Sequence, residues 1–344
     1  MSRYVFWIIV ALLATIPLWV TDYYLLHVAI VTGIFIIAAM SLNLLLGYTG
    51  QLSLGHVAFF GIGAYTSALV SLGFSVHIAP EIMVSLAPQP VWVGILCAAV
   101  LTGLVGYAIG KLAFRVRGAY FVIVSLSFAE VVRLIALNWV ELTQGPMALN
   151  SIPALTLGFG GYELSFLRKP QFFYLMLFIA ALSYILIARL VNSRAGRAMI
   201  ALRENESLAM SVGIDVTRSL VLATIVSAAI AGVAGALYTH YIRIVDPNIF
   251  LFIYTVTMVI MVVTGGKGTL AGPIVGGVIF GFVPEVLRGM QIRPEAQWIV
   301  YGILMIAIVY FLPEGIVPAV RRVLVSRRGK QYAAGFKEPQ AENK

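Results

Sequence analysis

The dominant pattern along the chain is a succession of long apolar runs separated by short polar or glycine-rich segments. A helix needs about 20 residues to cross roughly 30 Å of hydrocarbon, and long continuous runs favour helices over the short alternating strands of a barrel. The pattern therefore predicts an all-α integral membrane protein, a polytopic helical bundle of about ten transmembrane helices. The predicted spans lie near residues 5–21, 25–46, 52–72, 91–110, 119–138, 171–190, 219–240, 251–264, 270–287 and 297–313.

The composition supports this class. Of 344 residues, 61% are hydrophobic and 11% are charged, and the mean hydropathy is +0.98. A soluble domain has a much smaller apolar share. The single cysteine, Cys97, lies in an apolar run and can form no internal disulfide, so it carries no information about the redox compartment.

The formal charge of +9 indicates an orientation in the membrane rather than a nucleic-acid partner. The basic residues are scattered between the spans instead of gathered on one aromatic-bearing face, so no nucleic acid is expected. With the N-terminus in the cytoplasm, 17 of the 23 Lys and Arg residues fall on the cytoplasmic side, as the positive-inside rule requires. Both termini are then cytoplasmic. We expect a transmembrane domain over residues 1–320 and a basic, disordered cytoplasmic tail over 321–344, close to anionic membrane lipid.

The most polar internal segment covers residues 193–215. Its interior is rich in helix formers, and Gly196 and Gly213 stand near its two ends, so we predict one short helix closed by a C-terminal glycine. Small side chains on that helix would let another protein approach closely. The alternative is a solvated loop that joins two spans, which is common at membrane surfaces.

Three segments carry a resemblance to a known family. The residues from Glu206 to Gly213 resemble the coupling loop of bacterial ABC importer permeases, in a relaxed form of the Glu-Ala-Ala…Gly motif. Residues 41–65 and 265–276 look like two further signatures of the branched-chain amino acid permeases of the LivM type. Together the matching segments span most of residues 38–318, in the expected order.

The resemblance implies the permease subunit of an ATP-driven importer in the bacterial inner membrane. Such a transporter moves leucine, isoleucine or valine by alternating access. The implied partners are a second homologous permease subunit, two cytoplasmic ATP-binding subunits and an extracytoplasmic substrate-binding protein. The chain itself would be no enzyme and would bind no cofactor, because ATP and Mg²⁺ are used by the partner subunits.

The same resemblance implies which residues form the ATPase-coupling loop. In one departure, Leu208 stands where the family often has a second alanine. The coupling positions carried over are Gly196, Arg197, Arg203, Glu206, Ala209 and Gly213.

The segment Gly265–Thr269 could be mistaken for a phosphate-binding loop. That motif needs a glycine separated by four residues from a Gly-Lys pair, and Ser or Thr directly after the lysine. Met261 and Gly268 occupy those two places, so we expect no ATP hydrolysis by this chain. The four histidines lie in separate segments without metal-ligand spacing, and no metal site is expected.

Two glycine-rich segments predict a substrate pathway. A shift of 218 residues aligns Gly47 with Gly265 and Gly50 with Gly268, which suggests an internal repeat with two broken helices. Polar groups beside such breaks need partners, either across a pathway or in a helix contact, and packing alone is an equal alternative for any one residue. The candidates are Asn43, Gly47, Gln51, Ser53, His56, Gly265 and Gly268.

Two further features concern charge and the outer loops. Glu130 and Arg133 are three residues apart in one span and can form an intramembrane ion pair, with either a functional or a clamping role.

The loop of residues 77–90 contains three prolines and reads as an irregular connector. The loop of residues 141–170 is long enough to contact an extracytoplasmic binding protein, although an ordinary extended loop is equally consistent with it.

Two alternatives remain open from the sequence. In the first, the same transporter carries urea or short amides. In the second, the protein is a secondary ion-coupled amino acid transporter in which Glu130 is the coupling carboxylate. A secondary transporter would not need the segment 193–215 as a docking site.

Overall fold

The computed structural model describes residues 7, 11–19, 22–79, 82–114, 119–159, 162–291 and 294–322. The long helices are α3 (Tyr23–Asn43), α4 (His56–Leu72), α5 (Val91–Ala113), α6 (Ala119–Asn138), α8 (Lys169–Val191), α11 (Val216–Ile242), α12 (Phe252–Gly265), α13 (Gly272–Gly289) and α14 (Pro294–Phe311). The shorter ones are α2 (Ile16–Trp19), α7 (Val140–Thr143), α9 (Arg194–Glu204), α10 (Glu206–Ser211), the π-helix η1 (Leu44–Thr49) and the 3₁₀ turns η2 (Gly145–Met147) and η3 (Pro247–Phe250).

The helices follow the apolar runs of the sequence. Each of the nine predicted spans from 25–46 onwards overlaps one of the long helices. Among the described residues, five helical segments are long and apolar enough to cross a membrane, namely Tyr23–Thr49, Val91–Ala113, Tyr120–Asn138, Lys169–Val191 and Val216–Ile242. The protein is therefore a multi-pass helical membrane protein. Of the predicted span 5–21 the structure describes residues 7 and 11–19, which include α2, and of the tail 321–344 it describes only residues 321 and 322.

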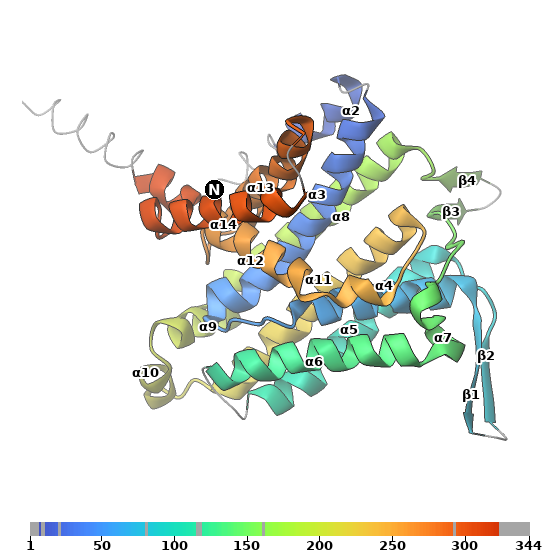
Figure 1. Cartoon of the computed structure of the whole chain (residues 1–344). Coiled ribbons are helices and arrows are strands. Elements are labelled where there is room, and N and C mark those ends of the chain that lie inside the picture. Colours follow the sequence, from blue (N-terminus) through green and yellow to red (C-terminus); the bar gives the residue numbers. More distant parts are fainter. Residues whose placement is uncertain are drawn as a thin grey trace, which may run out of the picture.

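The centre of the bundle consists of α3, α4 and α11 (Figure 1). Their contact surfaces carry small residues, which lets the backbones approach closely. The backbone of Gly63 in α4 lies directly against that of Gly232 in α11. Aromatic side chains fill the space beside these contacts, with Phe35 stacked on Phe60 at 5.8 Å between ring centroids. α6 and α8 lie at the periphery, where only 22% of each span is buried.

Two β-hairpins lie at the end of the bundle opposite α9 and α10 (Figure 1). The first pairs β1 (Phe74–Ala79) with β2 (Ile82–Leu86), and the second pairs β3 (Thr156–Phe159) with β4 (Tyr162–Ser165). The prediction of an irregular connector over residues 77–90 was therefore wrong for its first half, because antiparallel pairing satisfies the backbone there.

A hydrogen-bonded contact ties the first hairpin to α7. The backbone N–H and the ring Nδ1 of His77 lie 2.9 and 2.7 Å from Oε1 of Glu141. These interactions hold the pKa of the Glu141 carboxyl below its usual value, so the carboxylate remains charged in this contact at neutral pH.

The close α4–α11 contact yields a stability prediction. In Gly63→Ala the added methyl group would overlap the Gly232 backbone. We expect this overpacking to lower the free energy of unfolding by about 1–3 kcal/mol. Gly103→Ala on α5 is the matched control, because its new carbon meets α11 side chains at an ordinary 3.7 Å. Thermal unfolding of the detergent-solubilised protein should show a lower midpoint for Gly63→Ala only. Equal midpoints would contradict this packing.

Candidate coupling and translocation site

The segment after α8 folds as two short helices rather than the single helix predicted. Ser193 caps α9, where its Oγ accepts a hydrogen bond from the Gly196 N–H at 3.3 Å. Asn205 ends α9 in an extended conformation and caps α10, accepting a hydrogen bond from the Leu208 N–H at 3.0 Å. An asparagine that can cap a new helix explains the break, since its side chain competes with the helical backbone.

Gly213 ends α10 as predicted. Its φ of +85° lies in the left-handed region that favours glycine. Its N–H donates to the Met210 carbonyl at 3.0 Å, and the Ile214 N–H donates to the Ala209 carbonyl at 3.1 Å. This pair of bonds is a Schellman motif, which closes a helix and turns the chain sharply toward α11.

Three exposed apolar residues lie on α10 and directly after it, beside the exposed Ser207 and Ser211. Leu208 is 64% exposed, and Met210 and Val212 are also exposed; we call these three residues the apolar tip. By contrast, Ala209 is buried against Leu202 and neighbouring residues. The prediction that small side chains face outward was therefore wrong at Ala209, because the inward side of this short helix packs on the bundle.

Gly196 and the two charged residues of the coupling prediction have distinct surroundings. Gly196 lies in the first turn of α9, near one end of the segment as predicted, and a side chain there would overlap carbonyls at the end of α8. Arg197 is exposed and donates to the Asn192 carbonyl at 3.2 Å. Glu206 stands in the first turn of α10, where a carboxylate is favoured by the helix dipole.

Arg203, near the end of α9, reaches away from α10 into the bundle. Its Nη1 donates a hydrogen bond to the Gly47 carbonyl at 2.8 Å, and its Nη2 lies 2.5 Å from Glu204 Oε1. A side chain on Gly268 would overlap the Arg203 guanidinium. One side chain of the coupling segment thus contacts both glycine-rich segments.

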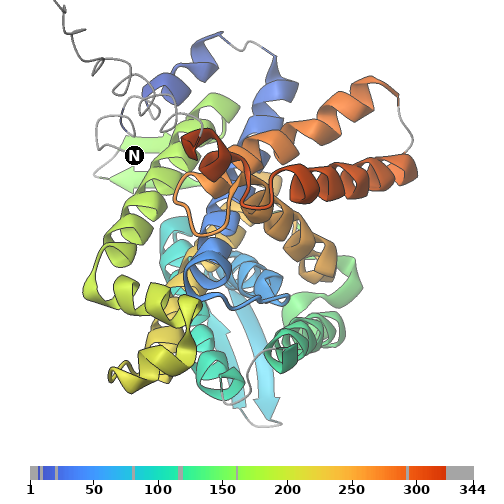
Figure 2. The ribbon, with the colours of Figure 1, turned by 90° about the vertical axis from the view of Figure 1, so that its left-hand side faces the viewer.

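Asn43 joins these two segments to each other. Its Nδ2 donates to the Thr269 carbonyl and its Oδ1 accepts from the Gly268 N–H, both at 2.9 Å. The side chain is almost fully buried. In Figure 2 the end of α3 and the α12–α13 connection lie side by side in the middle of the view. The backbones of Gly47 and Gly268, which the shift of 218 residues does not align with each other, are in direct contact, and the internal repeat stays a prediction.

Both segments depart from regular α-helix at their glycines. α3 continues as the π-helix η1, a form frequent at functional sites, and ends at Gly50 with φ +75°. Gly268 has φ +73° in the other segment. Gly265 packs on the backbone of Gly272, so a side chain there would overlap it. Close approach of backbones explains why these positions are glycines.

Of the remaining pathway candidates, two are buried and one is partly exposed. His56 is fully buried and its Nε2 lies 2.8 Å from Ser41 Oγ. Ser41 Oγ already donates to the Ala38 carbonyl, so His56 Nε2 is the donor. Ser53 is buried, while Gln51 is partly exposed at the end of η1. Within this chain, His56 therefore makes a helix contact.

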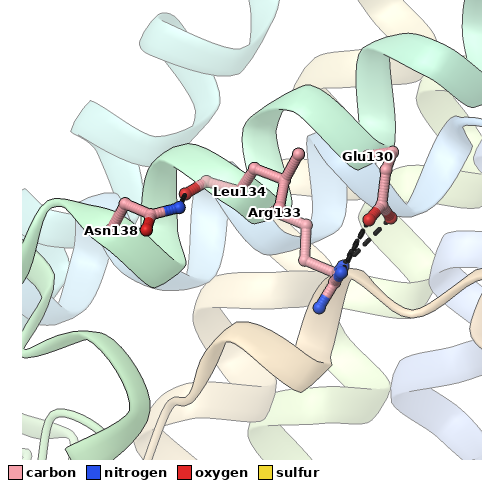
Figure 3. Close-up of polar contacts among 4 residues, drawn as sticks. All are labelled: Glu130, Arg133, Leu134 and Asn138. Carbon is pink, nitrogen blue, oxygen red and sulfur yellow. Dashed lines mark hydrogen bonds and ion pairs between the residues drawn. The ribbon is translucent and has the colours of Figure 1, made fainter.

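The predicted ion pair is formed on α6 (Figure 3). Arg133 Nη2 lies 2.6 Å from Glu130 Oε1, and Arg133 Nε donates to both carboxylate oxygens at 3.0 Å. The Glu130 side chain is 53% exposed and the Arg133 side chain 23%. The pair therefore lies on the outer surface of this chain.

A cavity of about 290 Å³ lies at the end of the bundle near Lys169 and Arg243, also lined by His27, His240 and Tyr241. None of the predicted pathway residues lines it. Among the described residues there is no group of three or more His, Cys, Asp or Glu side chains that could hold a metal ion.

Comparison with known proteins places the chain in a family. A family model described as the branched-chain amino acid transport system / permease component matches residues 24–309. The chain belongs to this permease family. It is 32% identical over 326 residues to the high-affinity branched-chain amino acid transport system permease protein LivM of Salmonella typhimurium, covering 88% of this chain and 72% of that protein.

Two further relatives are also similar over most of the chain. The LivM protein of Escherichia coli K12 is 31% identical, with the same coverage. The LivH permease protein of the same organism is 27% identical over 300 residues, which cover 84% of this chain and 93% of that protein. No solved structure matches the chain. Family membership confirms the resemblance drawn from the three sequence segments.

The bridge formed by Asn43 yields a second stability prediction. Asn43→Leu keeps the side-chain size but leaves the Gly268 N–H and the Thr269 carbonyl without this partner, at a cost of about 1–3 kcal/mol for each buried group. Asn138→Leu is the control, because Asn138 bonds only to its own helix, at the Leu134 carbonyl. We expect a lower unfolding midpoint for Asn43→Leu alone. A midpoint like that of the parent would show that the bridge is dispensable.

Proposed function

We propose that this chain is the permease subunit of an ATP-driven importer for branched-chain amino acids in the bacterial inner membrane. The observation that carries the proposal is the reach of Arg203, which connects an exposed surface segment to two broken segments inside the bundle. A transporter driven by a soluble ATPase needs such a connection. The names of the relatives, permease proteins of branched-chain amino acid transport systems, support the substrate class.

The end of the bundle that carries α9 and α10 is cytoplasmic in this proposal. Basic residues gather at this end, as expected for a cytoplasmic face. They are Lys111, Arg189, Arg194, Arg197, Arg203, Arg218 and Lys267. Two ATP-binding subunits, which use ATP and Mg²⁺, serve the complex, and one of them docks on the apolar tip. Both termini are cytoplasmic.

The opposite end faces outward and receives the extracytoplasmic substrate-binding protein. The β1–β2 and β3–β4 hairpins and α7 provide an ordered surface there (Figure 1). The sequence had suggested an irregular connector over residues 77–90 and a long loop over residues 141–170 at this end. The ordered surface gives a docking partner fixed backbone groups to contact.

ATP-driven movement of the docked subunits displaces α10 and α9. Arg203 transmits the displacement to Gly47 and the Gly268 segment, and the two broken segments move together because Asn43 joins them. Access to the substrate then alternates between the two sides. The pathway runs along these segments at the contact with a second, homologous permease subunit, past Gln51, Ser53 and Gly265. Its walls suit a zwitterion with an apolar side chain, because they are small and carry few fixed charges.

A secondary transporter is disfavoured by the state of Glu130. The carboxylate is held by three hydrogen bonds from Arg133. A proton-coupling carboxylate would have to give up this partner in every cycle. No feature of the described residues favours urea or short amides over branched-chain amino acids.

Reconstitution tests the proposed function. The complex of this chain with its partners, in proteoliposomes, should take up leucine, isoleucine or valine only with ATP and the binding protein, and unlabelled urea or acetamide should not compete. Uptake by this chain alone, driven by an ion gradient, would contradict the proposal.

The apolar tip yields a docking prediction. Leu208→Asp places a charge on an exposed apolar contact, and we expect at least a tenfold loss of co-purifying ATP-binding subunit with normal membrane insertion. Thr217→Asp is the control, because it adds the same charge at the exposed start of α11, at a residue that is not part of the tip. Equal co-purification in both variants would mean that the tip is not the docking surface.

Arg203 yields a coupling prediction. Arg203→Met keeps the length of the side chain but removes the charge-assisted hydrogen bond to Gly47, which contributes about 1.5–3 kcal/mol. The ATP-binding subunits should still co-purify and hydrolyse ATP. The amount of substrate transported per ATP hydrolysed should fall by about tenfold or more. Arg197→Met, on the exposed side of α9, should behave as the parent. Full coupling in Arg203→Met would refute the role of this residue.

A further inference from the structure

The peripheral helices differ in the chemistry of their exposed faces. On α8 the exposed residues between the two ends are apolar or aromatic and recur every four positions, at Tyr174, Phe178, Leu182 and Leu186. On α5 the exposed face is also apolar, with Trp92 near one end and Tyr107 near the other. Aromatic residues at the ends and aliphatic residues between them are typical of helices that contact lipid.

The exposed face of α6 is different. Its stripe of Tyr120, Ser127, Leu134 and Asn138 follows helical spacing and includes two polar side chains. Glu130 lies beside this stripe, as Figure 3 shows for its position relative to Leu134 and Asn138. Ser127 and Glu130 are in the middle of α6, where α8 has only apolar exposed residues.

The depth of Glu130 makes lipid an unsuitable neighbour. Glu130 lies eight positions before Asn138, the last residue of α6. At 1.5 Å per residue, this places Glu130 roughly 12 Å from that end of the helix. The short Glu side chain cannot reach an interface over that distance. A charged residue at the centre of a lipid-exposed helix is strongly unfavourable, and pairing with Arg133 removes only part of that cost. This face therefore needs a protein cover.

We infer that the face of α6 with Ser127, Glu130, Leu134 and Asn138 packs against the second, homologous permease subunit, while the exposed faces of α5 and α8 contact lipid. The inference rests on the proposed function. The cover must extend along a membrane-spanning helix, so a soluble ATP-binding subunit or binding protein cannot supply it. The relatives include two kinds of homologous permease protein, LivM and LivH, either of which has the required membrane-embedded character.

The charge of the α6 face defines the chemistry of its partner. Because Glu130 and Arg133 neutralise each other, the partner does not need a net charge at this depth. It needs uncharged hydrogen-bonding groups for the carboxylate oxygens and for Ser127, together with small residues that allow close packing. This requirement fits a helix of a homologous permease better than it fits lipid chains.

Site-specific photocrosslinking in membranes that contain the complete transporter tests the inference. Benzoylphenylalanine replaces Leu134 on α6 or, as the matched control, Leu182 on α8. The two side chains are 43% and 45% exposed, and neither belongs to the ion pair. We expect the Leu134 variant to give a crosslinked product of the two permease subunits, at least tenfold more abundant than from the Leu182 variant.

The other outcomes separate the inference from the proposed function. If the second permease co-purifies but crosslinks from position 182 and not from position 134, the assignment of the α6 face is wrong and the proposed function stands. If the second permease co-purifies and neither position crosslinks, the assignment is also wrong. If no second permease co-purifies with the parent chain, the assignment and the proposed pair of permeases both fail.

Discussion

The backbone groups freed where a helix breaks inside the bundle must find partners within the protein, because lipid offers none. This chain breaks its helical path twice in neighbouring places, after α3 and after α12. Asn43 supplies a donor and an acceptor to the second break, and Arg203 supplies a donor to the first. Glycines at 47 and 268 allow the two segments and the guanidinium to come close enough for these bonds. The rest of the arrangement depends on this cluster.

The cluster also explains how a surface segment can act on the interior. α9 is fixed to the end of α8 by the close contact at Gly196, and α10 extends beyond it with an apolar tip. Arg203 of α9 bonds with the first of the broken segments, at the Gly47 carbonyl. In the proposed mechanism, displacement of α10 reaches the bundle interior through this short polar connection together with the packing of Met199 of α9 in the core.

Much of the fold could be predicted from the sequence because bilayer thickness fixes the length of an apolar run. Asn43 was recognisable as a polar residue in such a run, and Glu130 and Arg133 as a pair at helical spacing. Gly213 was recognisable as a helix end. These features depend only on local spacing and on the cost of unpaired polar groups.

The remaining features depend on contacts between distant parts of the chain. The bond from Arg203 joins residues 156 positions apart, and nothing near Arg203 in the sequence indicates its partner. The inward orientation of Ala209 follows from packing on Leu202 and Val216, which decides the rotation of α10. In β1 the apolar Phe74, Val76 and Ile78 alternate with Ser75 and His77, but the prolines that follow within residues 77–90 favoured an irregular loop. Asn205 is both the C-cap of α9 and the N-cap of α10. Helix propensity alone does not show that the helix ends at this residue and a new one begins.

The central claim is that the coupling segment and the broken segments move as one unit. Pulsed electron paramagnetic resonance on the assembled transporter, with Cys97 replaced by alanine, measures this directly. Spin-label pairs join Ser211 of α10 either to Lys267 or to Ser85 of the β1–β2 hairpin, all of them exposed positions. Between the nucleotide-free and ATP-bound states, the account predicts an unchanged distance from 211 to 267 and a changed distance from 211 to 85. A change in the distance from 211 to 267 as large as that from 211 to 85 would contradict it.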